Sequence, residues 1–429
     1  MTPPTTPPVP RSQRRPLGFL LVATIISLLG SQITVIALPW FVLSTTGSAA
    51  KAGLVGFATL LPGLAVGLFG GVFVDQLGFK RVSVTADVVS GIGIAAIPLC
   101  YATIGLAFWQ LLVFVFIGSL LAVPALTARR SMVPELAQHA GIPLDRVNAL
   151  FESCQHLALL LGTPVAGLLV AGLGAQRVLW LDAATFAFSA IAVGIGIPVS
   201  LFTRRAFASQ GYLQNVLAGL RFIRRDELLW PMVIVLASFN AINASIVGVM
   251  LPWYAKQHFG SAASLGVILA GAGGGAFLGA TMFGLWSSRL PRRYLWMSSF
   301  MLAPFEFWVF TISPSIAVLV AVFFLVGITT GPINPLMVTI RHERSPEALR
   351  GRVFSTYSAV SMAAQPLGIL LAGSLIDRIG FLPTVIAFAV CSQLIGLMTL
   401  IIPAFRQMDA LRPAPSVIAE IDPPLPAQV

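Results

Sequence analysis

Long apolar stretches alternate with short polar segments along almost the whole chain. The first follows a Pro-, Thr- and Arg-rich segment, residues 1–16, and continues to Leu43. Eleven more follow, and each is long enough to cross the ~30 Å hydrocarbon core of a bilayer as an α-helix. They lie near residues 51–74, 82–103, 107–128, 148–173, 177–199, 230–255, 262–287, 294–312, 315–340, 352–376 and 380–404. The pattern predicts an all-α membrane protein with twelve transmembrane helices.

The composition supports this prediction and excludes several other classes of protein. Of the 429 residues, 57% are hydrophobic and only 10% are charged, whereas a soluble domain carries ~25% charged residues. The three cysteines are far apart and lie in apolar stretches, so we expect no metal site. The sequence contains no HExxH, GxSxG or Walker motif. We therefore expect a protein that is not an enzyme, needs no cofactor and is not an ATP-driven pump.

The net charge of +11 has an explanation that does not involve nucleic acid. If both termini are cytoplasmic, 22 of the 26 Lys and Arg residues fall in cytoplasmic segments. Such an excess is typical of the cytoplasmic loops of membrane proteins. We expect a multi-pass protein of the cell (inner) membrane with both termini inside, surrounded by membrane lipid, and with no nucleic-acid partner.

The two halves of the chain repeat one another. The segment Leu38–Trp40 recurs as Leu251–Trp253, and Gly47–Ala50 recurs as Gly260–Ala263, both with an offset of 213 residues. Parallel repeats of this kind place a binding site between two bundles in many transporters. The predicted parts are a disordered cytoplasmic tail 1–16, six-helix bundles 17–200 and 230–404, a cytoplasmic linker 201–229 with an interfacial helix near 211–225, and a cytoplasmic tail 405–429.

The segment between the second and third apolar stretches carries a recognisable signature. It resembles the G-x-x-x-D-x-x-G-x-[KR]-[KR] loop of the major facilitator superfamily, through Gly71, Asp75, Gly78, Lys80 and Arg81. The resemblance implies two pseudo-symmetric six-helix bundles that alternate access by rocking. These five residues would then form part of an inner gate. The equivalent segment of the second half has Ser288 and Pro291 in place of the Asp and the second Gly, so this gate is predicted to be one-sided.

Three further segments are similar to the macrolide-efflux and enterobactin-exporter branch of the superfamily. They are Leu28–Trp40, Leu181–Phe186 and Gly219–Arg225. The resemblance implies export of a hydrophobic or amphipathic small molecule by proton antiport, with the proton gradient as the energy source. One departure concerns the fourth stretch, 107–128, which contains no Arg. The intramembrane proton-relay arginine of better-known drug antiporters is therefore predicted to be missing.

Ionisable residues inside apolar stretches are costly and are candidates for proton coupling. Glu152 and His156 are four residues apart and share a helical face. Glu306 is the acid deepest in a stretch, and Asp182 follows Arg177, with which capping or pairing is also expected. A further acid, Asp87, follows Arg81 by six residues and is expected to pair with it.

Uncharged polar residues are the candidates for contact with the substrate. A few convergent polar groups in an apolar pocket are what an amphipathic ligand needs. The resemblance places the first and seventh helices along a central cavity. The candidates are Gln32, Thr34, Asn240, Asn243 and, between two prolines of the tenth stretch, Asn334.

Two alternatives to drug export remain open from the sequence. The first is a siderophore or lysophospholipid transporter of the same fold. The second is a membrane sensor or scaffold that does not transport. The chain has no long soluble segment through which a sensor would signal, which argues against the second alternative. We expect a monomer.

Overall fold

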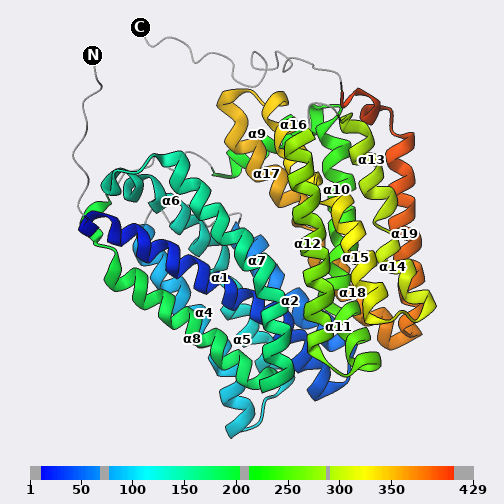
Figure 1. The fold of residues 1–429 in the computed structure, drawn as a ribbon, viewed down its shortest axis with the longest axis horizontal. Coiled ribbons are helices and arrows are strands. Elements are labelled where there is room, and N and C mark those ends of the chain that lie inside the picture. Colours follow the sequence, from blue (N-terminus) through cyan, green and yellow to red (C-terminus); the bar gives the residue numbers. More distant parts are fainter. Residues whose placement is uncertain (1–10, 68–76, 203–211, 287–289, 410–429) are drawn as a thin grey trace. The chain divides into compact units, whose positions relative to one another are not determined.

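The computed structural model describes residues 11–67, 77–202, 212–286 and 290–409, and their regular structure is helical throughout (Figure 1). Eleven of the described helices are long and apolar enough to cross a membrane, and a twelfth apolar helix, Ala49–Leu64, is shorter. The predicted all-α architecture with twelve membrane helices is confirmed.

The first half of the chain contains seven described α-helices. They are α1 (Arg11–Thr46), α2 (Ala49–Gly67), α4 (Phe79–Thr103), α5 (Phe108–Leu120), α6 (Ala122–Ala140), α7 (Leu144–Leu173) and α8 (Ala175–Gly196). Because α1 begins at Arg11, the predicted disordered tail to residue 16 is too long. The fourth span, formed by α5 and α6, continues to Ala140 and does not end at residue 128 as predicted.

The second half begins with a helix outside the apolar spans and repeats the layout of the first. Its α-helices are α9 (Tyr212–Arg225), α10 (Leu229–Ser245), α11 (Leu251–Tyr254), α12 (Ala262–Trp286), α13 (Arg292–Leu302), α14 (Phe305–Trp308), α15 (Ile316–Thr330), α16 (Ile333–Arg344), α17 (Arg350–Met362), α18 (Gln365–Ile379) and α19 (Phe381–Ile401). The π-helical segment η2 (Ile246–Met250) joins α10 to α11, and a second one, η3 (Ala255–Phe259), follows α11, so that the four form one span. The helix α9 occupies the position of the predicted linker helix.

The turns that end the first span of each half share a backbone conformation. Gly47 has a φ of 67° and Gly260 a φ of 64°, and the two residues are separated by the repeat offset. Only glycine adopts this left-handed conformation at little cost. The sequence repeat is therefore matched by a repeat in the backbone.

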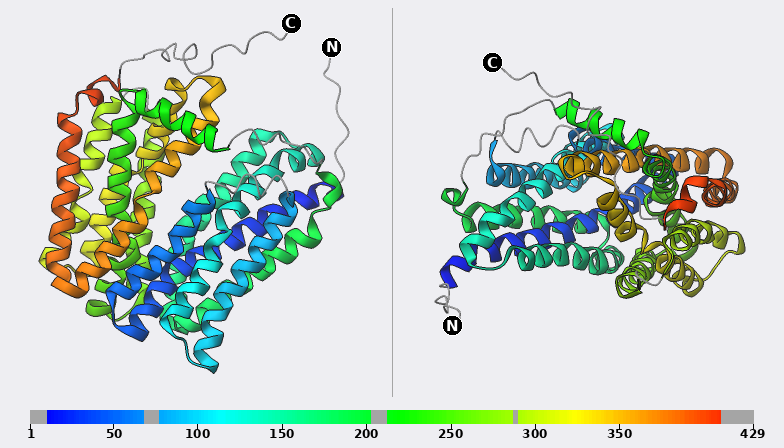
Figure 2. Two further views of the ribbon diagram at one scale, coloured as in Figure 1. Left: turned by 180° about the vertical axis from the view of Figure 1, so that it is seen from behind. Right: turned by 90° about the horizontal axis from the view of Figure 1, so that it is seen from above.

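The chain divides into two compact units. Unit 1 contains the first half together with residues 245–270 and 369–378, and unit 2 contains the rest of the second half. In unit 1, α1 packs along α7 and α8, while α4 packs along α8 (Figure 2). In unit 2, the core is built around Trp296, Tyr357 and Phe405.

A glycine seam brings α12 and α15 together inside unit 2. A Cβ atom added at Gly275 would lie 2.0 Å from the carbonyl oxygen of Phe324, and one added at Gly279 would lie 2.0 Å from that of Ile328. Small residues of this kind let the backbones of membrane helices approach closely. Gly273, on the same helix, has nothing within 4 Å of its added Cβ.

The seam predicts opposite effects for two alanine substitutions on one helix. Gly275→Ala is expected to destabilise unit 2 by about 1–3 kcal/mol, because the added methyl group forces α12 and α15 apart. Gly273→Ala is expected to be neutral or to stabilise by up to about 1 kcal/mol, through helix propensity. Thermal unfolding in detergent measures both changes, and equal melting temperatures for the two variants would contradict the seam.

Candidate transport site

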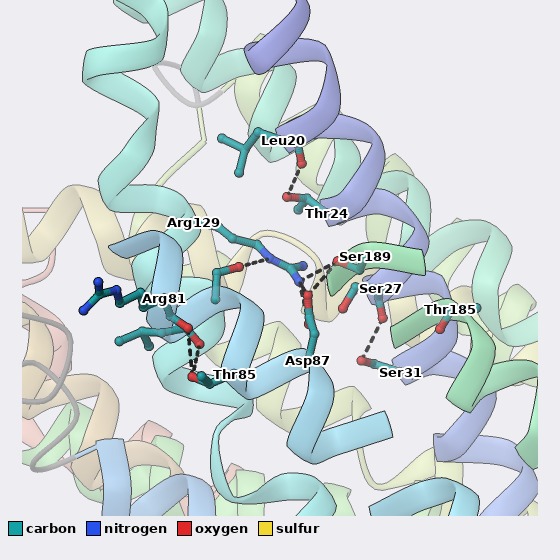
Figure 3. A network of polar contacts seen from close by, with 12 residues as sticks. Leu20, Thr24, Ser27, Ser31, Arg81, Thr85, Asp87, Arg129, Thr185 and Ser189 are labelled. Atoms are coloured by element: carbon teal, nitrogen blue, oxygen red, sulfur yellow. Dashed lines mark hydrogen bonds and ion pairs between the residues drawn. The ribbon is translucent and has the colours of Figure 1, made fainter. Parts of the chain in front are cut away.

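A buried ion pair occupies the interior of unit 1 (Figure 3). Nη2 of Arg129, on α6, lies 2.6 Å from Oδ1 and 2.5 Å from Oδ2 of Asp87, on α4. Arg129 is only 2% exposed and Asp87 only 1%. Hydroxyl groups extend the network: Arg129 Nε donates to Ser83 at 3.1 Å, Ser189 donates to Asp87 at 2.8 Å, and Ser27 also hydrogen-bonds to Asp87. Removing two charges from water is costly, and their attraction and added hydrogen bonds must compensate for it.

This ion pair corrects two predictions from the sequence. Asp87 was expected to pair with Arg81, but its partner is Arg129, and the Arg81 side chain points away from Asp87 (Figure 3). The fourth span was expected to contain no arginine, whereas Arg129 is buried within it. The predicted span ended just before Arg129, whereas the helix runs on to Ala140 and the Arg129 charge is paired with Asp87 inside unit 1.

A cavity of about 360 Å³ opens beside the ion pair. Asp87 and Arg129 form part of its wall. The rest of the lining combines a second arginine, Arg130, with hydroxyl groups and apolar side chains, among them Ser31, Ser90, Leu126 and Phe186. Its volume is at the lower end of the range for small-molecule pockets, and a mostly apolar wall with a few polar groups is typical of such pockets.

Asp182 is joined to one of the predicted substrate residues. The Asp182 side chain is fully buried on α8 and accepts hydrogen bonds from Thr34 on α1 and, at 3.3 Å, from Thr185. Its hydrogen bonds therefore go to these hydroxyl groups rather than to Arg177. Gly30 makes room for the contact, because a Cβ there would lie 2.5 Å from Asp182 Oδ1. Sequence reasoning selected Thr34 and Asp182 for separate roles, and the structure brings them together.

A second pairing of predicted residues lies in unit 2. The buried Glu306, on α14, accepts a hydrogen bond of 3.1 Å from Asn243 on α10. Asn240, one turn earlier, donates to the carbonyl oxygen of Ser361 on α17 at 2.9 Å. These two asparagines connect α10 to its neighbours.

The two remaining substrate candidates lie in different settings. Gln32 lies on α1 facing α7, where a Cβ at Gly162 would come within 2.6 Å of it. Asn334 is exposed near the start of α16. Neither residue lines the 360 Å³ cavity.

Glu152 lies outside the buried network. It forms an ion pair with Arg130, in which both side chains are about half exposed, and accepts a 3.1 Å hydrogen bond from Gln155. The side chain of its predicted partner, His156, lies outside the described residues. The Glu152–His156 pair stays a prediction.

The structure describes three of the five residues of the predicted inner gate. Gly71 and Asp75 lie outside the described residues. Gly78 precedes α4 with a φ of 84°, a conformation that favours glycine. Lys80 and Arg81 lie in the first turn of α4. The role of these residues as a gate stays a prediction.

Comparison with known proteins places the chain in a family. Residues 11–427 match the family described as transmembrane secretion effector. The multidrug efflux pump Tap of Mycobacterium tuberculosis is 33% identical over 423 residues, which cover 96% of this chain and 98% of that protein. The chain belongs to this transmembrane secretion effector family. The predicted membership of the major facilitator superfamily is thereby confirmed.

More distant similarities agree with the assignment. Macrolide efflux protein A of Streptococcus pyogenes is 21% identical, with 83% of this chain and 88% of that protein covered. The structure of the nucleoside transporter NupG has a TM-score of 0.76 at 13% identity and covers 90% of this chain and 98% of that one. A bacterial homologue of the human lysosomal transporter Spinster has a TM-score of 0.70 at 12% identity and covers 94% of this chain and 99% of that one. At these identities, the two structures support the fold alone.

Sequence reasoning missed the buried ion pair of Asp87 and Arg129, although a signal was present. Ser83, Asp87 and Ser90 recur at spacings of four and three residues along an otherwise apolar helix, and Ser27 and Ser31 do the same on α1. Such stripes place polar groups on one helical face. Two facing polar stripes inside a bundle would have indicated a shared partner.

Proposed function

We propose that this protein is a secondary active exporter of hydrophobic or amphipathic, drug-like molecules, driven by proton antiport with alternating access. The observation that carries the proposal is the 33% identity, over 96% of the chain, to a protein named as a multidrug efflux pump. The name of macrolide efflux protein A supports the same substrate class. These names favour drug export over siderophore or lysophospholipid transport. The proposed location is the inner membrane, with both termini cytoplasmic.

The proposed coupling site is Asp87. It is the carboxylate in the wall of the 360 Å³ cavity, and its countercharge is Arg129. The guanidinium group does not lose its proton in proteins, so protonation of Asp87 would leave an uncompensated positive charge beside the cavity. That charge would repel a cationic substrate. Proton and substrate would thereby exclude one another, which is the requirement for exchange.

Asp182 and Glu306 are assigned supporting roles. Both are buried, and the hydrogen bonds described above link them to uncharged groups, Thr34 and Asn243. Neither lines the cavity. Amide replacements keep the shape of these side chains and much of their hydrogen-bonding capacity. We therefore place energy coupling at Asp87 and helix positioning at the other two.

Uptake into proteoliposomes tests the export proposal. An interior-acid pH gradient is imposed, and initial uptake is measured for a macrolide, a lipophilic cation, a lysophospholipid and a siderophore. The gradient is expected to raise uptake of the first two several-fold, and a protonophore is expected to abolish the increase. Uptake indifferent to the gradient would remove the antiport assignment, and uptake of the lysophospholipid or siderophore alone would replace the substrate class.

The same assay tests the roles of the two supporting carboxyl groups. Asp182→Asn and Glu306→Gln are each expected to keep the gradient dependence and at least about a third of the wild-type rate, because the isosteric amides preserve their hydrogen bonds. Loss of gradient dependence in Glu306→Gln, with normal folding, would move the coupling site to unit 2. The same result for Asp182→Asn would move it to the α1–α8 contact.

A further inference from the structure

The start of α2 is capped by a carboxylate from the second half of the chain, within unit 1. Asp377, in the last turn of α18, accepts hydrogen bonds from Ser48 Oγ at 2.5 Å, from Ala49 N at 2.9 Å and from Ala50 N at 3.0 Å. The first N–H groups of a helix have no partner in the helix itself and carry a partial positive charge. Asp377 supplies both the acceptor and the opposite charge.

The end of α1 binds a lysine side chain that also comes from the second half of the chain. Lys256, on η3, donates through Nζ to the carbonyl oxygen of Leu43, which also accepts a hydrogen bond of 3.0 Å from Gly47 N. Leu43 lies in the last turn of α1, where the carbonyl groups carry a partial negative charge. The turn between α1 and α2 is thus held at both sides by charges that complement the helix ends.

The helices beside this turn, α2 and α18, approach closely through glycines. A Cβ at Gly373, on α18, would lie 2.4 Å from the carbonyl oxygen of Ala49, and one at Gly53, on α2, would lie 2.8 Å from that of Ile369. The Asp377 contacts tie α18 to the start of α2, and the Lys256 contact ties η3 to the end of α1.

The sequence of α18 repeats the spacing of the predicted inner gate at the other end of the chain. Gly373, Asp377 and Gly380 follow the same G-x-x-x-D-x-x-G spacing as Gly71, Asp75 and Gly78. With the predicted orientation, the turn between α1 and α2 faces the outside. The predicted gate at the inner face therefore has a counterpart in sequence at the outer face.

We propose that Asp377 and Lys256 form a two-point latch that holds the outer end of unit 1 closed and is released once in each transport cycle. The inference rests on the alternating-access function proposed above. Release exposes the N–H groups of α2 and the carbonyl group of α1 to water, which replaces the lost hydrogen bonds. The two charges therefore set the ratio of outward-open to outward-closed molecules.

Distance measurements between spin labels test the latch directly. Labels are attached at Lys51→Cys and Arg378→Cys, two exposed positions that flank the contact, in full-length protein whose three native cysteines are replaced by serine. Pulsed electron resonance in lipid nanodiscs then gives the populations of short and long distances. Asp377→Ala is expected to raise the ratio of long to short distances about tenfold, because it removes a charged helix cap. Lys256→Met is expected to change the ratio in the same direction.

Asp145 provides a matched control. It is an exposed acid in the first turn of α7, so Asp145→Ala removes a carboxylate from a helix start elsewhere in unit 1 and should leave the ratio unchanged. Asp377→Glu is expected to restore part of the closed population. Unchanged ratios in both Asp377→Ala and Lys256→Met would overturn the latch, and so would an equal shift in Asp145→Ala. Shifted populations without transport of any tested substrate would support the latch and count against export.

Discussion

Asp87→Asn is expected to abolish the dependence of uptake on the pH gradient. An amide cannot exchange a proton in the working pH range, so the charge beside the cavity would no longer change during the cycle. The variant also leaves the buried Arg129 guanidinium without its countercharge. Breaking a buried ion pair from one side costs about 3–5 kcal/mol. The melting temperature should therefore fall together with the gradient dependence.

A second variant separates coupling from folding. In Asp87→Asn/Arg129→Met neither charge remains, and replacing both members of a buried pair with neutral side chains is often close to neutral for stability. The double variant is expected to regain most of the lost stability, measured by thermal unfolding, and still to show no gradient dependence. Restored gradient dependence in this variant would show that Asp87 does not couple the proton. Equal stability of the single and double variants would contradict the buried pair.

The overall architecture was predictable because it depends on local properties of the sequence. Hydropathy over a window of about 20 residues identifies a membrane helix, and the repeat of Leu38–Trp40 and Gly47–Ala50 fixes the two halves. The boundaries were less predictable. A charge such as Arg129 reads as the end of a span unless its buried partner is known, and that partner lies 42 residues away.

The pairing of site residues depends on packing between helices, which a single sequence does not encode locally. Thr34 and Asp182 are 148 residues apart, and Asn243 and Glu306 are 63 apart. Each was identified as a polar residue in an apolar setting, but nothing in its neighbourhood named its partner. Asp377 is a different case, because its G-x-x-x-D-x-x-G spacing was visible in the sequence and only its position, near the end of a late span, hid its relation to α2.

Unit 2 contains a buried ion pair whose members do not line the cavity of unit 1. Asp226 precedes α10 and accepts hydrogen bonds from the backbone N–H groups of Leu228 at 2.9 Å and Leu229 at 2.8 Å. Arg344, at the end of α16, contacts both of its carboxylate oxygens through Nε, at 3.1 and 3.0 Å. The Asp226 side chain is 2% exposed and that of Arg344 is 11% exposed. One carboxylate thus caps α10 and fixes it to α16.

Asp226→Ala is expected to destabilise unit 2 by about 3–5 kcal/mol, because it removes a helix cap and leaves the Arg344 charge without its partner. Glu347→Gln is the control, since its contact with Arg350 at 3.7 Å involves a side chain that is 89% exposed, and exposed pairs contribute about 0–1 kcal/mol. Thermal unfolding in detergent measures both losses, and a similar small loss in the two variants would contradict the structural role of Asp226.

The transport assay separates this ion pair from the one in unit 1. Asp226 and Arg344 take no part in the lining of the 360 Å³ cavity, so the fraction of Asp226→Ala that remains folded is expected to keep its gradient dependence and its substrate preference. Asp87→Asn is expected to lose the gradient dependence even in the fraction that folds. If both variants lost it after correction for folded protein, burial of charge alone would account for the effect, and the assignment of proton coupling to Asp87 would fail.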